Sequence, residues 1–235
     1  MFNPAARIQA VPLFDDNVCL LFDDFLLQPE QWLERAVEFR GRFQPPRTNA
    51  YPGHELRLPD SISDAFSRQL LPLFKQHFHL RRLQQSYCRL SMVSLPPSAL
   101  TPAQRLCHRD RFACQNGELA LASVLYLFQD PALGGTAFFR PRQGPEQTDR
   151  LLFDSNSLSA SAFDEKYAVA PGYMTEDNPY FERQAVVQAR WNRLIVYSGM
   201  LFHSGDIQRP EAMCDDPRAG RLTLNGFYTG RRALR

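Results

Sequence analysis

The sequence lacks the runs and patches that mark several classes of protein. No stretch approaches the roughly 18 consecutive apolar residues of a membrane-spanning helix, and no basic segment with a following apolar stretch opens the chain as a secretory signal would. Lysine and arginine (27 residues) nearly balance aspartate and glutamate (25), and apart from the tail "RRALR" they form no basic patch. We therefore expect a cytoplasmic protein with no membrane or nucleic-acid partner.

Cysteine is also scarce. Its five positions are Cys19, Cys88, Cys107, Cys114 and Cys214, and they follow no regular spacing. Because an odd number cannot pair completely, free thiols in a reducing compartment are the simpler interpretation. The chain has no internal repeat or low-complexity segment, and its 235 residues, 44% of them apolar, suffice for a single domain with a real core.

The apolar periodicity changes along the chain. The N-terminal part predicts a strand at 18–26 and two helices, at 29–40 and near 61–78, where Pro72 could kink or end the second helix. Extended runs then dominate, at 86–95, 106–110, 119–128, 136–140, 190–207 and 220–230. The runs on either side of the turn "QDPALGG" predict a hairpin-like pair. Helices first and strands later favour an α+β fold with a sandwich or jelly-roll core.

One long segment has no strong period. We expect a single domain over 1–235 with an insertion at about 141–188, which is polar and contains Tyr167, Tyr173 and Tyr180. A connection of this length is usually functional, partly helical or mobile. It could form a lid or wall over a site, or it could be a surface insertion that packs against the helices.

The sharpest local feature is the pair His108 and Asp110 in "LCHRD". On an extended strand, residues i and i+2 share a face, so both side chains can converge on one point. His203 in "LFHSGD" adds a second imidazole, and two histidines with one carboxylate form the facial triad of non-heme iron oxygenases. A His-x-Asp pair alone is common by chance. Cys107 points to the opposite face of such a strand, which argues against a shared Cys/His zinc site.

The context of this pair resembles the prolyl-4-hydroxylase-like branch of the 2-oxoglutarate and Fe(II)-dependent dioxygenases. The resemblance rests on the order of "HRD", "VLYLF" with "GGTAFF", "NRLIVYSGMLFHSG" and "GRLTLNGFY", and on the opening "LLFDDFLLQPEQW". The chain also looks like an uncharacterised bacterial family of unknown function. The dioxygenase resemblance implies a double-stranded β-helix, the cupin-like jelly roll, with the N-terminal helices packed on one sheet.

The resemblance also implies roles for individual residues. The implied Fe(II) ligands are His108, Asp110 and His203, and the implied contacts to the distal carboxylate of 2-oxoglutarate are Arg221, Thr223 and Tyr126. One departure from the family is the longer segment between His203 and Arg221, which contains "RPEAMCDDPRA".

The implied reaction is hydroxylation of an unidentified small molecule, peptide or protein, with release of succinate and carbon dioxide. Two alternatives stay open. One is a cupin-like metalloprotein that does not use 2-oxoglutarate, and the other is a catalytically silent binding module of the same fold. Taken singly, Arg221 could be a surface ion-pair residue and Tyr126 a core residue.

Overall fold

The computed structural model describes residues 1–47, 50–110 and 117–233. The strands are β1 (Arg7–Pro12), β2 (Val18–Asp23), β3 (Gly53–Arg57), β4 (Leu80–Val93), β5 (Glu118–Tyr126), β6 (Thr136–Pro141), β7 (Phe181–Val187), β8 (Leu194–Ser198), β9 (Phe202–Gly205) and β10 (Arg221–Arg232). The α-helices are α1 (Glu30–Glu38), α2 (Asp60–Phe78), α3 (Pro145–Ser157) and α4 (Ala160–Tyr167). Short 3₁₀ helices lie at Arg40–Arg42, Pro97–Ala99, Pro102–Arg105, Pro131–Leu133 and Pro210–Ala212.

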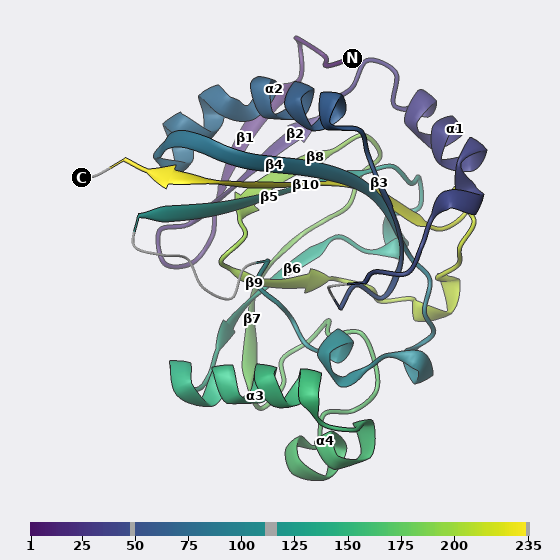
Figure 1. Cartoon of the computed structure of the whole chain (residues 1–235), viewed down its shortest axis with the longest axis vertical. Coiled ribbons are helices and arrows are strands. Elements are labelled where there is room, and N and C mark those ends of the chain that lie inside the picture. Colours follow the sequence, from purple (N-terminus) through teal and green to yellow (C-terminus); the bar gives the residue numbers. More distant parts are fainter. Residues whose placement is uncertain (48–49, 111–116, 234–235) are drawn as a thin grey trace.

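The strands form two antiparallel sheets (Figure 1). The major sheet has the order β1-β2-β8-β5-β10-β4-β3, and the minor sheet has the order β7-β6-β9. In Figure 1, α1 and α2 lie on one side of the major sheet, while α3 and α4 lie beyond the minor sheet. The prediction of a mixed α+β chain with N-terminal helices against one sheet is therefore confirmed.

Helix α2 is held to the major sheet by one apolar stripe. Phe66, Leu70 and Phe74 recur at four-residue spacing, are fully buried, and belong to the same core cluster as Leu224 of β10. Such spacing places side chains on one helical face. Pro72 lies within α2 without ending it.

The structure corrects the strand pairing that the sequence predicted. The run at 119–128 and the run at 136–140 do not form a hairpin, because β5 belongs to the major sheet and β6 to the minor sheet. Between them Gly134 has φ of 94°, and a Cβ there would lie 2.2 Å from the Asp206 carbonyl oxygen. A glycine is thus needed where the chain crosses between the sheets.

The run at 190–207 is likewise two strands, β8 and β9, in different sheets. The predicted short strand at 106–110 is reduced to one isolated bridge, in which His108 pairs with His203. The segment 141–188 contains α3, α4 and β7, so most of it has regular structure that its weak period did not reveal.

Two further expectations concern cysteines and membranes. Cys19, Cys88, Cys107 and Cys214 are free thiols, and Cys114 lies outside the described residues. Across the described part of the chain, none of the helices combines the length and apolar character needed to cross a membrane.

Candidate metal centre

Backbone pairing brings the two predicted histidines together. The N–H of His108 donates to the His203 carbonyl and the N–H of His203 donates to the His108 carbonyl, both at 2.9 Å. The two imidazole rings lie 4.4 Å apart between centroids. Asp110 is fixed separately, because its N–H donates to the Gly199 carbonyl at 2.9 Å, just after β8. Ligand atoms of the three side chains all lie within 4.8 Å of one another.

Among the described residues, one carboxylate oxygen of Asp110 has no hydrogen-bond partner. Its Oδ1 lies 3.7 Å from the Nε2 atoms of both His108 and His203, too far for a hydrogen bond, and the side chain is 11% exposed. Its Oδ2 is buried and has no hydrogen-bond partner among the described residues. Adjacent ligand atoms on an octahedral divalent ion lie roughly 3 Å apart. The set therefore fits a metal ion after movements of about an ångström or two.

The orientation of His203 also suits a ligand. Its Nδ1 lies 2.8 Å from the Leu201 carbonyl, which can only accept, so Nδ1 carries the proton in this arrangement. The lone pair of the neutral ring is then on Nε2, the atom that faces Asp110. A hydrogen bond to the second ring nitrogen is the usual way in which proteins orient a metal-binding histidine.

Burial shifts the pKa values of Asp110 and His108 in the metal-free protein. Desolvation raises the pKa of Asp110, although the charges of His203 and Arg89 oppose the shift. Desolvation, with His203 and Arg89, lowers the pKa of His108 well below its ordinary value. The His108 side chain is 55% exposed and lines the same cavity as Asp110 and His203. A neutral imidazole is the form that binds metal.

The three side chains line a cavity of about 1210 Å³. Arg221 lines the same cavity and is 5% exposed. Its Nε donates to the Gly134 carbonyl at 3.1 Å and its Nη2 to the Gly135 carbonyl at 2.9 Å. The described residues supply no carboxylate partner for this guanidinium, so its charge is not balanced by any of them.

The other two predicted cofactor contacts differ in position. Thr223 is 1% exposed, lines the cavity, and its hydroxyl donates weakly to the Ser91 carbonyl at 3.4 Å. Tyr126 is fully buried and does not belong to the cavity lining. Its hydroxyl is 2.8 Å from that of Thr136, which does line the cavity. Tyr126 thus supports the wall from behind in this arrangement.

Comparison with protein families gives one clear match. The model of a family of unknown function, DUF6445, matches residues 4–228. The chain belongs to this family. No curated protein sequence matches the chain.

The DUF6445 chain also resembles solved structures at low identity. They include the non-heme alpha ketoglutarate dependent epimerase SnoN from nogalamycin biosynthesis (TM-score 0.47, 14% identity, 92% of this chain and 81% of that chain). HygX from Streptomyces hygroscopicus with nickel and 2-oxoglutarate bound is similar, with a TM-score of 0.44 and 16% identity over 93% of this chain and 84% of that chain. AviO1 from Streptomyces viridochromogenes Tue57 is similar too, with a TM-score of 0.45 and 13% identity over 91% of this chain and 89% of that chain. Likeness at this level carries no conclusion about activity, so function has to be inferred from the residues of the DUF6445 chain itself.

Gly199 is a site residue that sequence reasoning missed. A Cβ at this position would lie 2.9 Å from Asp110 Oδ2 and 3.3 Å from the Asp110 Cβ. The absent side chain therefore makes the space that the carboxylate occupies. The available signal was a glycine within an apolar strand run, which often marks a close approach by another group.

The segment before β7 forms part of the cavity wall. The sequence had left open whether it forms a wall or a surface insertion. Tyr173 donates from its hydroxyl to the Leu95 carbonyl at 2.6 Å. The carbonyl of Met174 accepts from the Ser204 hydroxyl at 2.8 Å, and its sulfur accepts from the Cys107 N–H at 3.1 Å. Ser204 and Cys107 each adjoin one of the two histidines. Met174 is therefore anchored beside both.

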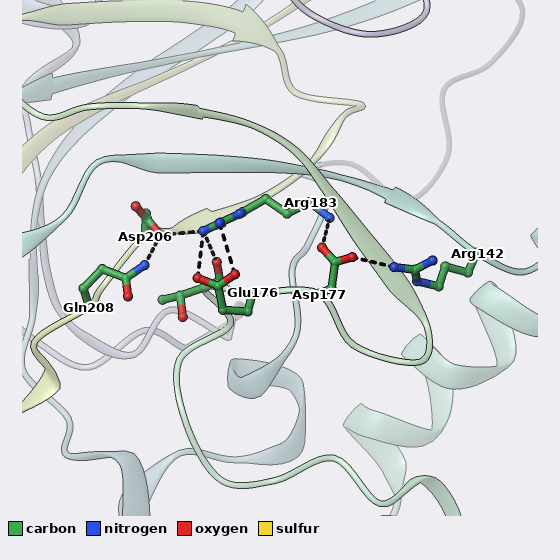
Figure 2. A network of polar contacts seen from close by, with 7 residues as sticks. Arg142, Glu176, Asp177, Arg183, Asp206 and Gln208 are labelled. Atoms are coloured by element: carbon green, nitrogen blue, oxygen red, sulfur yellow. Dashed lines mark hydrogen bonds and ion pairs between the residues drawn. The ribbon is translucent and has the colours of Figure 1, made fainter.

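Charged side chains fasten the same segment to the minor sheet (Figure 2). Arg183 of β7 forms an ion pair with Glu176 at 3.1 Å and lies 3.9 Å from Asp206, which follows β9. The N–H of Arg183 donates to Asp177 at 2.8 Å, and Asp177 also accepts from Arg142 at 2.6 Å. These bonds hold the wall against β7 and against Asp206, the residue that follows β9.

Proposed function

We propose that this DUF6445 protein is an Fe(II)- and 2-oxoglutarate-dependent dioxygenase that hydroxylates a small molecule or a peptide, releasing succinate and carbon dioxide. One observation carries the proposal: the same cavity contains a His/Asp/His set and a buried arginine that has no carboxylate partner among the described residues. The double-stranded β-helix fold and membership of the prolyl-4-hydroxylase-like branch belong to the same proposal. Two antiparallel sheets with a site between their strands support it.

Each residue has a task in this proposal. His108, Asp110 and His203 hold the iron on one side, which leaves the other positions for ligands. Bound iron with 2-oxoglutarate supplies the chemistry that turns dioxygen into an oxidant of C–H bonds. Arg221 binds the distal carboxylate of 2-oxoglutarate with the N–H groups that Gly134 and Gly135 do not use, and the Thr223 hydroxyl donates beside it.

The alternatives are less well supported. A cupin-like metalloprotein without 2-oxoglutarate has no need of Arg221, whose burial is unfavourable unless an anion pairs with it. A silent binding module has no need of an unpaired carboxylate between two histidines. The cavity of about 1210 Å³ exceeds the ~300–1000 Å³ of ordinary ligand pockets. It therefore has room for a cosubstrate and a substrate together.

The decisive experiment is an anaerobic titration of Fe(II) and then 2-oxoglutarate, monitored through the weak visible charge-transfer band of their chelate. We expect the band to appear in the wild-type protein. Replacing Arg221 with Ala should leave Fe(II) affinity intact and weaken 2-oxoglutarate binding by about 2–5 kcal/mol. Arg221→Lys should recover only part of that loss, since an ammonium group lacks the planar fork.

The matched control is Arg7→Ala, which removes an exposed arginine that does not line the cavity. Succinate release in air provides a second measurement. Absence of the band in a protein that binds Fe(II), or unchanged 2-oxoglutarate affinity in Arg221→Ala, would contradict the proposed cofactor site.

A further inference from the structure

The inner face of the major sheet continues beyond Arg221 and Thr223. On β10, Asn225 and Phe227 follow at two-residue spacing and also line the cavity. The register places Asn225 opposite Arg89 and Phe227 opposite Tyr87 on β4. Directly opposed side chains on one face of an antiparallel pair lie in contact range. The cavity therefore has a second polar position, one step along the sheet from the proposed 2-oxoglutarate anchor.

Arg89 is held in a fixed orientation. Its guanidinium carbon lies 4.7 Å from the centre of the Phe227 ring and 5.4 Å from that of the Tyr51 ring. Its Nη1 forms an ion pair with Glu55 at 2.6 Å, and the side chain is 13% exposed. Its Nε–H is buried and has no acceptor among the described residues. An arginine with a purely structural role normally has its buried donors filled by the protein.

The side-chain amide of Asn225 is likewise without a hydrogen-bond partner in the part of the chain that the structure describes. The residue is 7% exposed, and within the described ranges 1–47, 50–110 and 117–233 its side-chain amide takes part in no hydrogen bond. The amide offers two donors and an acceptor, and leaving such a group buried and unpaired is unfavourable. Since Asn225 and Arg89 are neighbours on the cavity face, a single ligand can satisfy both.

The charges around the cavity indicate which ligand. Arg105 and Arg109 line the cavity, while the carboxylates that pair with them, Asp164 and Asp149, do not. Asp110, the candidate metal ligand, is the lone carboxylate residue in the described lining. The wall thus presents donors to the interior. Glu55 offsets the Arg89 charge, so the pair suits a planar carboxylate with one negative charge better than a phosphate with two.

We propose that Arg89 and Asn225 bind a carboxylate of the substrate, which is therefore an organic acid whose apolar body lies between this pair and the metal centre. Val93, Leu95 and Val124 supply apolar lining nearby. Arg89 lies close enough to the centre for its charge to lower the pKa of both Asp110 and His108. The assignment of a substrate rests on the proposed function, whereas the acid-binding pair is defined without it.

The test uses three probes of one shape: 3-phenylpropanoate, 3-phenylpropanamide and 2-phenylethylphosphonate. Each is titrated into protein loaded with Mn(II) and saturated with 2-oxoglutarate, and into metal-free protein. Line widths of the probe protons in NMR give the affinity and, with Mn(II), the proximity to the metal. We expect the carboxylate to bind at least about tenfold more tightly than the amide and the phosphonate.

The variants separate binding from a structural role. Arg89→Gln should weaken the carboxylate at least about tenfold and Asn225→Ala about threefold, with unchanged Mn(II) and 2-oxoglutarate affinities. Arg89→Lys should restore part of the loss. Glu55→Gln removes the ion pair but keeps Arg89, so it should bind the carboxylate as well as the wild type or better. Arg82→Gln, on the exposed part of the same strand, is the matched control, and thermal unfolding checks folding.

Each outcome is informative. Equal affinity for carboxylate and amide, tighter binding of the phosphonate, or equal losses in Glu55→Gln and Arg89→Gln would overturn the proposal. If Mn(II) and 2-oxoglutarate bind but the carboxylate probe does not, the acid-binding role of Arg89 and Asn225 is wrong while the proposed function stands. If Mn(II) and 2-oxoglutarate do not bind while the metal-free protein still takes the carboxylate through Arg89, the acid-binding pair stands and the proposed function fails.

Discussion

The two faces of β4 and β10 differ completely, although they belong to the same two strands. On the outer face Leu90, Leu222 and Leu224 are 0–1% exposed and pack in the core beneath the helices. On the inner face, Arg89 and Asn225 alternate with them and have hydrogen-bonding capacity that none of the described residues uses. A strand can therefore serve stability with one set of side chains and a site with the other, because successive residues point in opposite directions. Substitutions on the two faces should have separable effects.

The largest expected effect is the loss of metal affinity when a candidate ligand on the inner side is removed and the core is left unchanged. His203→Ala or His108→Ala should reduce Fe(II) affinity at least about a hundredfold, more than loss of an outer-shell partner does. The unfolding temperature of the metal-free protein should change little, since the backbone bridge between positions 108 and 203 does not need the imidazoles. Metal analysis after dialysis measures this. Stoichiometric iron of wild-type affinity in either variant would show that the residue is not a ligand.

The converse change weakens the core and should leave metal binding at the site unchanged. Leu224→Ala removes a fully buried side chain under α2 and should lower the free energy of unfolding by about 2–5 kcal/mol. Metal affinity at a temperature where the variant is folded should be unchanged. Urea denaturation gives the free energy, and Leu27→Ala, at a leucine that is 58% exposed, is the matched control with little effect. Loss of metal affinity in folded Leu224→Ala would mean that the faces are coupled.

A smaller effect on metal affinity is expected at Gly199, where the missing side chain leaves room for the Asp110 carboxylate. Gly199→Ala places a methyl group 2.9 Å from Asp110 Oδ2, so the carboxylate has to move. We expect metal affinity to fall roughly tenfold, as when a group that orients a ligand is altered. Gly41→Ala is the control, because a Cβ there meets no atom within 4 Å. Equal metal affinities of the two variants would show that the metal site does not depend on Gly199.

The smallest expected effect lies at the C-terminal end of β2, away from both faces of β4 and β10. Hydrogen bonding from Arg193, with Arg190 nearby, lowers the pKa of Asp23 below its ordinary value of 3.8. The stabilisation is therefore complete above that value and is lost as pH falls through the lowered folded-state pKa. Because Asp23 is about one-third exposed, Asp23→Asn should cost only about 0.5–1 kcal/mol at neutral pH. Urea denaturation of both proteins across this pH range measures it, and a difference independent of pH would contradict the assignment.

Local pattern was sufficient for part of the fold. The stripe of Phe66, Leu70 and Phe74 defined α2, and two-residue spacing put His108 beside Asp110 and Arg221 beside Thr223. The strands β1, β3 and β7 were missed, because partly exposed strands carry weaker apolar signals than the central ones. Local pattern also could not show that Tyr126 lies behind Thr136, since burial behind a wall depends on the opposite sheet.

The sequence by itself determined the element types of the central strands, because strand pattern is local, and the chemistry of the candidate ligands, because ligand type is a property of each side chain. Only the tertiary structure decided which strands pair. Partner choice separated β5 from β6 and β8 from β9, and it brought Gly199 against Asp110, Met174 beside both histidines, and Asn225 opposite Arg89. Those contacts join residues far apart in sequence, and they follow from the closure of two sheets around one cavity, which no local pattern encodes.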